Sequence, residues 1–566
     1  MTGRALVFVP FVLVFSFGPG FLFLRRMRWN PMEKICGSIA LSLLIIGGLS
    51  FAVYLSGLPR WGYYGITAVA GALTLAGADG WGLIGDHHVR RTAAAFGLLV
   101  IWTLGLQALI RHYSGGDWCC DWVEHYQRSL FFLERWPREF RFIDRYPLTT
   151  RPPLMNLVCA YFLANVGEEF ALYQIAFSLL NLLVFFPCCL FARRFAPRVK
   201  HLPLLVAIFL AFNPMFFMNT TFAWTKALAA FFIVLSVWLY LAGWRKNDRR
   251  RISAAFICLS AGLLVHFSAL PYAVFLGLAY LTSIWWWQNH RARALAIVAL
   301  PAIAVGTVWF AWSIVEYGAG TTFTANATVA GTASGDLEGN LLRIGSNTWH
   351  TFRPYIFPSQ PEDSTLRRLT DRAFTFYQEN FLGAIGSINA YAVIAILVAT
   401  LGLARTGLPA RERRFWWAFI PFTILGGIAI DGETSPSGVA NICLQPLVYL
   451  GVTLVAARYV LLSRGARVLI WAGVFSDFIL GVALEVHMES QMRMWARTPN
   501  WDWKQREHLV YLGDLLDASA RSVRAGLLVA AMVGLAYLGR LAFTSPANGL
   551  PVQTPSRDAR NRRLRG

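Results

Sequence analysis

The chain has 566 residues, of which 56% are hydrophobic and 14% are charged, and its net charge is +21. Soluble globular domains are about 25% charged, so this composition excludes an ordinary soluble protein and indicates an integral membrane protein. The positive charge lies in short clusters between apolar runs, which argues against nucleic-acid binding and fits cytoplasmic loops that face anionic lipids.

Apolar runs near the length of a membrane-spanning helix recur along the chain, and a basic cluster follows every second one. We therefore predict an all-α polytopic helical bundle with roughly fifteen crossings, its N-terminus outside and its C-terminal tail in the cytoplasm. No A-x-A-like cleavage site follows the first run, so it is interpreted as a retained helix. The predicted crossings are 4–24, 35–57, 64–84, 92–111, 171–191, 201–218, 226–244, 252–266, 268–287, 294–317, 383–404, 415–430, 446–462, 467–485 and 524–543.

Three long polar stretches separate groups of crossings on the external side. The first contains an apolar segment, 152–166, that is short for a crossing and predicts a helix at the membrane interface. Segment 265–271 predicts either a break between two helices or a kink in one. The expected regions are N-terminal transmembrane helices (1–111), a first large external loop (112–170), core transmembrane helices (171–317), an external loop (318–382), transmembrane helices (383–485), an external loop (486–523), and the last helix with a basic cytoplasmic tail (524–566).

The first external loop concentrates ionisable side chains in a chain where charge is otherwise scarce. Asp117 follows two glycines, and Asp121 opens the sequence DWVEHY. On a helix, Glu124 and His125 share the face of Asp121. A membrane protein that gathers such groups at one membrane face usually uses them for chemistry or transport, so this loop is the candidate functional region.

A series of motifs from about residue 114 to 281 resembles the integral-membrane glycosyltransferases of the C-type fold. The most similar members are protein O-mannosyltransferase-like and lipid A aminoarabinose-transferase-like enzymes, which use polyprenyl- or dolichyl-phosphate sugars. The shared motifs are the loop aspartates, Arg151-Pro152-Pro153-Leu154, the short apolar helix, a crossing that ends in Arg193-Arg194, and a hairpin-like stretch, NPMFFMNTTFAWTKALAAFF.

The resemblance implies a C-type glycosyltransferase fold and an inverting hexosyl or pentosyl transfer. The donor would be a polyprenyl-phosphate-linked sugar and the acceptor a lipid, glycan or protein, with membrane lipids around the bundle. It implies an external-loop aspartate as general base and cations that hold the carrier phosphate. No cofactor is expected, and dependence on a divalent metal is left open. The expected location is a bacterial inner membrane, with the site on the periplasmic side.

Asp121 is preferred over Asp117 as the base, although the family usually has Asp followed directly by Glu, and either aspartate could simply cap a helix. Substrate contacts are assigned to Glu124, His125, Arg128, Arg151, Lys226 and His266.

Three of these residues also have a structural interpretation. Arg151 or Lys226 could instead extend its charge toward the interface, and His266 could be a polar core residue. Lys226 stands where aminoarabinose-type relatives often have Asp. This reversal of charge weakens the inference that the chain uses the same substrate as those relatives.

The main rival is a transporter or flippase of lipid-linked saccharides. It predicts ionisable residues near the bilayer midplane and inverted-repeat halves, whereas this sequence places them at one face and shows no repeat. A third interpretation is a family relative that has lost catalysis and serves as an assembly subunit.

Overall fold

The computed structural model describes residues 2–110, 121–197, 199, 201–287, 291–325, 337–352, 409–430, 440–495, 509–515 and 520–544. These residues form helices and one isolated β-bridge, between Phe142 and Tyr146. In chain order the helices are α1 (Thr2–Leu24), α2 (Pro31–Leu55), α3 (Trp61–Ala76), η1 (Ala78–Gly85), α4 (His87–Leu109), α5 (Asp121–Glu134), η3 (Leu148–Thr150), α6 (Leu154–Val166), α7 (Phe170–Leu182), α8 (Phe185–Phe195), α9 (Leu202–Ala211), α10 (Pro214–Thr221), α11 (Lys226–Lys246), α12 (Arg249–Val265), η4 (Phe267–Ala269), α13 (Leu270–Trp287), α14 (Arg291–Thr324), α16 (Leu337–Phe352), α19 (Ala410–Ile430), α20 (Ala440–Arg458), η5 (Tyr459–Leu461), α21 (Arg464–Trp495), α22 (Leu512–Leu515) and α23 (Ala520–Phe543).

Nine helices within the described ranges are long and apolar enough to cross a membrane, or ten if the bent pair α9–α10 is counted as one span. The prediction of an all-α, multi-pass membrane protein is therefore confirmed. Helices α3 and α12 were predicted as crossings but have 16 and 17 residues, fewer than the roughly 20 that a spanning helix needs. The predicted crossing 383–404 lies outside the described residues.

The basic clusters meet at one end of the bundle. Arg251, at the start of α12, lies 2.9 Å from Glu33 at the start of α2. Glu412, at the start of α19, lies 3.1 Å from Arg245 and 3.5 Å from Arg194, which belong to the last turns of α11 and α8. Alternate connections therefore share one end, as the sequence predicted, and we call it the basic end.

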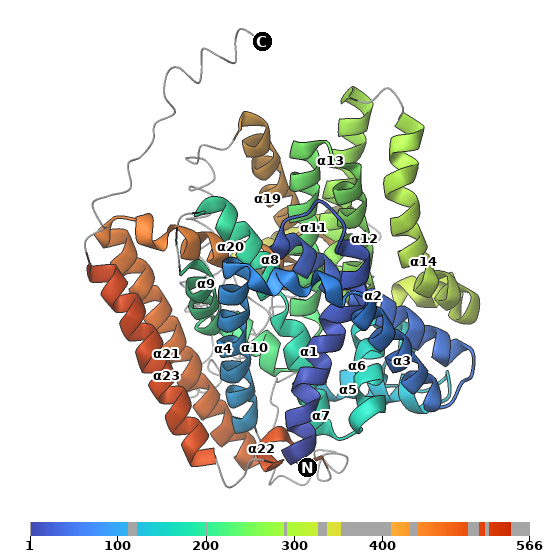
Figure 1. Cartoon of the computed structure of the whole chain (residues 1–566), viewed down its shortest axis with the longest axis horizontal. Helices are drawn as coiled ribbons and strands as arrows, with labels where there is room; N and C mark the ends of the chain where they lie inside the picture. The colour runs from blue at the N-terminus through green and yellow to red at the C-terminus, as the bar shows by residue number, and fades with distance from the viewer. Residues whose placement is uncertain are drawn as a thin grey trace.

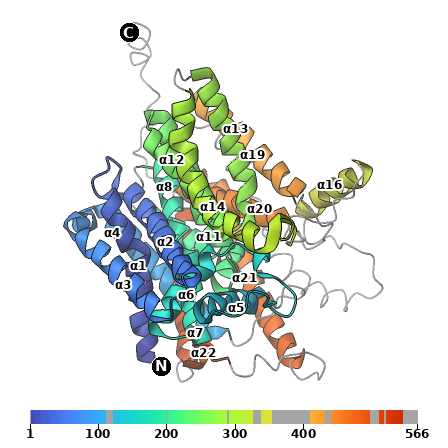
Figure 2. The same ribbon diagram turned by 90° about the vertical axis from the view of Figure 1, so that its right-hand side faces the viewer.

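The opposite end carries the N-terminus together with α5, α6, α7 and α22, and we call it the site end (Figure 1). Arg60, just before α3, lies 2.5 Å from Glu168, just before α7, and Arg4 lies 3.0 Å from Glu169. Helices α1, α2 and α3 form one group beside this end, while α21 and α23 pack side by side at another edge (Figures 1 and 2). The site end thus holds the described connections before α3 and α7, on the side away from the basic end.

The predicted crossing 201–218 is not one straight helix. Helices α9 and α10 meet at an angle of 78° at Asn213-Pro214. The residue before a proline is disfavoured in helical conformation, and the Asn213 side chain instead accepts a 3.1 Å hydrogen bond from the Phe216 N–H to begin a new helix. This bend brings the chain toward the start of α11 at the site end.

The apolar segment 152–166 forms α6, and protein surrounds it. All residues from 154 to 164 are buried, and α6 packs on α2, α5, α3 and α7. We predicted an interfacial helix because its length is short for a crossing; the structure explains the same composition by burial inside the bundle.

Three helix boundaries differ from the prediction. Helix α3 stops at Ala76 and continues only as the 3₁₀ segment η1, because residues 77–85 contain four glycines and each costs about 1 kcal/mol in a helix. Helix α14 continues through a kink at Gly318, whose φ of 80° favours glycine. Helix α21 extends to Trp495, beyond the crossing predicted at 467–485.

Candidate functional site

Six residues predicted to contact substrate lie together at the site end, although they span more than a hundred positions of sequence. They come from four places in the chain. Glu124, His125 and Arg128 lie on α5, Arg151 precedes α6, Lys226 begins α11, and His266 follows α12. The charges of Lys226, Arg151 and Arg128 act on His125, and those of Lys226 and Arg151 act on His266, so the six form one electrostatic cluster.

Arg128 connects α5 to the segment that carries Arg151. Its Nε donates a 2.8 Å hydrogen bond to Oε1 of Glu124, one turn earlier on the same helix. Its other nitrogens donate to the carbonyl oxygens of Leu148 (2.8 Å) and Pro147 (3.0 Å), and its guanidinium lies 4.3 Å from the centre of the Phe142 ring. These protein contacts and its full burial fit a positioning role better than the substrate contact that we predicted.

Arg151 approaches the same carboxylate from the other side. Its Nε lies 3.6 Å from Oε1 of Glu124, and its side chain is only 12% exposed. Two prolines follow it, which favours an extended backbone, and its φ and ψ are −130° and 134°. The motif Arg-Pro-Pro therefore holds this guanidinium inside the bundle, in contrast to a side chain that reaches outward to the interface.

Lys226 lies in the first turn of α11, where the helix dipole makes a cation unfavourable. Its side chain is 5% exposed, and Nζ lies 3.0 Å from the centre of the Trp224 ring. The side chain of Asn181 fixes this helix start, because it donates to the Trp224 carbonyl oxygen (2.6 Å) and accepts from the Leu228 N–H (2.9 Å). A buried lysine at the positive end of a helix is an arrangement that an anion would stabilise.

His266 occupies a true break between α12 and α13. Its backbone is extended (φ −160°, ψ 141°), and the 3₁₀ turn η4 follows it, so the chain reverses here. Nδ1 accepts a hydrogen bond from the Ser268 N–H at 3.1 Å. Burial first, and then the charges of Lys226 and Arg151, hold the pKa of His266 well below its usual value. The ring is therefore neutral with its proton on Nε2, which can donate to a ligand.

The described part of the cluster contains three basic side chains, Arg128, Arg151 and Lys226, and one carboxylate, Glu124. Burial raises the pKa of Glu124, but the charges of Arg128 and Arg151 outweigh it and lower the pKa to about 2. Burial lowers the pKa of His125 to about 3. At neutral pH the cluster thus has an excess of positive charge in a buried place, which favours an anionic ligand.

Several buried polar atoms of the described cluster have no hydrogen-bond partner. They are Oε2 of Glu124, Nδ1 of His125, Oγ1 of Thr149 and Oγ1 of Thr225. Buried polar groups are normally paired, so unpaired ones together indicate space that a ligand or water fills. Neither threonine is predicted from the sequence, although each is close in sequence to a predicted residue, Arg151 or Lys226.

The proposed base is not part of this geometry. Asp117 lies outside the described residues, and the side chain of Asp121 does too. The backbone places Asp121 as the first residue of α5, one turn before Glu124 and His125. Its choice over Asp117 therefore stays a prediction.

A short segment from the C-terminal part of the chain covers the first turn of α5. The Tyr511 ring lies 6.3 Å from that of Trp122 and 5.2 Å from that of Phe170. The Leu512 N–H donates a 2.7 Å hydrogen bond to Oε1 of Gln174 on α7. No local pattern in the sequence could have predicted this pairing over more than 300 residues.

We expect Glu124→Gln to destabilise the protein by roughly 3–5 kcal/mol, because it leaves two buried guanidinium groups without their carboxylate. The measurement is thermal unfolding of the purified protein in detergent. The matched control is Glu169→Gln, which breaks the exposed pair with Arg4 and should cost about 0–1 kcal/mol. Equal losses in the two variants would contradict the buried network.

We also expect stability to fall as the pH is lowered from about 6.5 toward 3. Burial holds the pKa of His125 at about 3, so between that pH and its ordinary value near 6.5 the unfolded chain binds the extra proton and unfolding is favoured by about 1.4 kcal/mol per pH unit. The pKa of Glu124 is also lowered, which adds a loss of the same sign below its ordinary value of about 4.5. The measurement is melting temperature against pH, where His125→Gln should flatten the profile between pH 4.5 and 6.5. A variant profile parallel to that of the wild type would contradict this account.

Within the described ranges, no group of three or more His, Cys, Asp or Glu residues is arranged to hold a metal ion.

Comparison with protein-family models and with curated proteins gives no match. Two solved structures are similar to the chain: ArnT from Cupriavidus metallidurans bound to undecaprenyl phosphate, and the same protein in the apo state. Each is 15% identical with a TM-score of 0.32; the matches cover 65% and 67% of this chain and 76% and 77% of the other. At this TM-score the similarity carries no weight for function, which depends here on the side chains of the cluster.

Proposed function

We propose that the chain is an inverting C-type glycosyltransferase that moves a sugar from a polyprenyl-phosphate carrier to an acceptor at the outer face of a membrane. The observation that carries the proposal is the convergence of Arg151, Lys226 and His266 at the site end, with more positive than negative charge and with unpaired buried polar atoms beside them. A lipid monophosphate supplies the missing negative charge, and its chain can lie along the apolar helices.

The cluster would act mainly on the leaving group. When the bond between the anomeric carbon and the phosphate oxygen breaks, the phosphate passes from one negative charge toward two. Buried cations stabilise that developing charge more than the charge of the intact donor, so they lower the barrier. Arg151 and Lys226 supply charge, and the Nε2–H of His266 supplies a neutral donor.

The acceptor side of the reaction needs one base. Its hydroxyl or amine attacks the anomeric carbon from the face opposite the phosphate and forms the new bond as the old one breaks. The acceptor proton passes to a loop carboxylate, for which we retain Asp121 before Asp117. Glu124 is unsuited to this role because two guanidinium groups hold it ionised with its pKa near 2, which makes it a weak proton acceptor.

The test incubates the purified full chain with a panel of polyprenyl-phosphate sugars and measures free polyprenyl phosphate and transferred sugar. Release that depends on added acceptor, and is lost in Lys226→Met, would support the proposal. No release with any donor, or release unchanged in Lys226→Met, would contradict it.

The rival function, transport of lipid-linked saccharides, has its own readout. Proteoliposomes that scramble a labelled lipid-linked sugar between leaflets, without cleaving it, would support a flippase and remove the transferase proposal. The bacterial inner membrane and a periplasmic site remain our proposal for location; the basic end, by the positive-inside bias, would then face the cytoplasm.

A further inference from the structure

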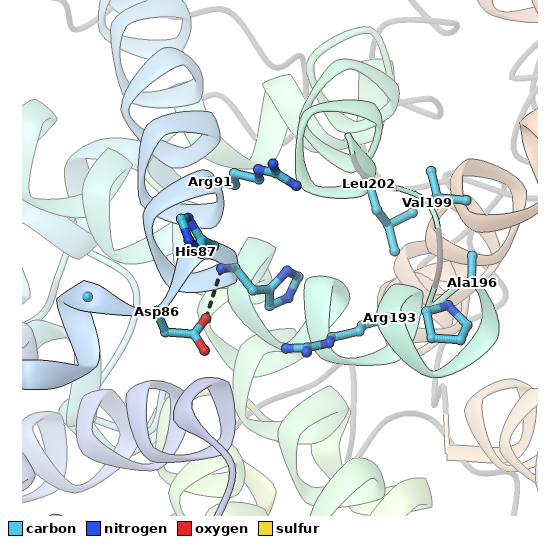
Figure 3. A pocket seen from close by; sticks show the side chains of 10 residues that line it. Asp86, His87, Arg91, Arg193, Ala196, Val199 and Leu202 are labelled. Carbon is cyan, nitrogen blue, oxygen red and sulfur yellow. Dashed lines mark hydrogen bonds between the residues drawn. The ribbon is translucent and has the colours of Figure 1, made fainter.

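A separate cavity lies at the basic end, between the start of α4, the end of α8 and the start of α9. Its volume is about 360 Å³, within the range of small-ligand sites. It is lined by Gly85, Asp86, His87, His88, Arg91, Arg193, Ala196, Pro197, Val199 and Leu202. In Figure 3, Arg91 lies at the upper edge and Arg193 at the lower edge of the space, and Asp86 and His87 lie on the same side of it. None of these residues belongs to the candidate site.

One side of the cavity is cationic. The charge of Arg193 acts on both Asp86 and His88, and Nε2 of His88 is buried without a hydrogen-bond partner among the described residues. The one carboxylate on the lining is Asp86, and its Oδ1 accepts the N–H groups of His88 (2.8 Å) and Val89 (3.0 Å) as the cap of α4. That carboxylate is held by the helix start, so two guanidinium groups face the space against one capping anion.

The other side is apolar: Ala196, Val199 and Leu202 lie there (Figure 3), and Pro197 also lines the cavity. The position of the cavity along the membrane normal can also be inferred. It lies where the spans His87–Leu109 and Phe170–Phe195 reach the basic end, the level at which lipid headgroups meet a membrane protein. A ligand here would have a compact anionic group between two arginines and an apolar continuation toward the membrane.

We propose that this cavity binds the phosphate-bearing headgroup of an anionic phospholipid, with the phosphate between Arg91 and Arg193 and the glycerol and upper acyl atoms on the apolar side. Arginine pairs recognise phosphate through forked hydrogen bonds, and basic pockets between membrane helices bind such headgroups. The site is independent of the sugar carrier, because it lies at the opposite end of the bundle from the cluster around Arg151.

The test is native mass spectrometry of the full chain in detergent with added dioleoylphosphatidylglycerol or dioleoylphosphatidylcholine. We expect phosphatidylglycerol to bind more tightly than phosphatidylcholine, and its affinity to fall roughly tenfold or more in Arg91→Gln/Arg193→Gln. The control Arg413→Gln/Arg414→Gln removes the same charge from exposed side chains at the same end and should change affinity by less than about twofold. The single change Arg193→Gln, at an exposed helix end, repeats the test if the double variant unfolds.

Equal phosphatidylglycerol affinity in the cavity variants and the wild type would overturn the proposal, and so would an equal loss in the control. Inorganic phosphate separates the two sources of the anion. If it displaces phosphatidylglycerol at similar concentrations, the cavity is a site for free anions and the lipid assignment is wrong. If phosphate at large excess leaves the lipid bound, the apolar wall contributes as proposed.

Discussion

Asp121→Asn should lower the rate of sugar transfer by roughly 10²–10⁴-fold while leaving carrier affinity nearly unchanged. The change removes a proton acceptor without altering size. Asn caps a helix as well as Asp does, so any contribution of residue 121 to the start of α5 is kept. The measurement is the rate of polyprenyl-phosphate release at saturating donor, together with the binding constant of the free carrier.

Two variants make this result specific. Asp117→Asn tests the competing base and should have the smaller effect. Asp144→Asn is the matched control, because Asp144 is exposed in the same part of the chain and its φ of 56° suits Asn as well as Asp. A large loss in Asp117→Asn alone would exchange the two roles, and full activity in both Asp121→Asn and Asp117→Asn would remove the mechanism.

The second large effect is expected on carrier binding. Arg151→Gln should weaken the binding of undecaprenyl phosphate by roughly tenfold or more, since a buried charge-assisted contact with the phosphate is lost. Folding should change less than in Glu124→Gln, because Arg128 still neutralises Glu124 at 2.8 Å. The measurement is quenching of intrinsic tryptophan fluorescence on titration with the carrier.

The control for that experiment is Arg141→Gln. Arg141 is exposed and lies ten residues earlier, so its loss removes the same charge outside the cluster. Unchanged carrier affinity in Arg151→Gln would place the phosphate elsewhere. Equal weakening in both variants would reduce the effect to general electrostatic attraction of the loop.

Much of this architecture could be predicted because a membrane restricts the length and composition of the segments that cross it and the side on which basic loops lie. The alternation of apolar runs with basic clusters placed the ends of α2, α8, α11 and α12 correctly, since a positive loop at every second connection fixes the direction of each helix. The residues of the cluster could also be predicted from the sequence, because ionisable side chains are energetically costly in a membrane protein and usually have a functional role.

Other features depend on tertiary packing that no local pattern contains. The apolar composition of α6 is compatible with both a membrane interface and a protein interior. Its burial results from the helices that pack around it, which the local sequence does not indicate. The sequence predicts a substrate contact for Arg128 but gives no sign that the carbonyl groups of Pro147 and Leu148 accept hydrogen bonds from it. The bend at Asn213 has a local signal, Asn-Pro, but it lies within a long apolar run that by itself predicts one continuous crossing.

The contact of Tyr511 with Trp122 means that a segment from the C-terminal part of the chain completes the packing around the first turn of α5. Synthesis of the first three hundred residues would therefore leave Trp122 and Phe170 uncovered until the last helices arrive. We therefore expect the first turn of α5 to become fully packed only after the C-terminal part of the chain has been made. A chain truncated before residue 509 should still insert into the membrane, but the start of its α5 should be less ordered than in the full chain.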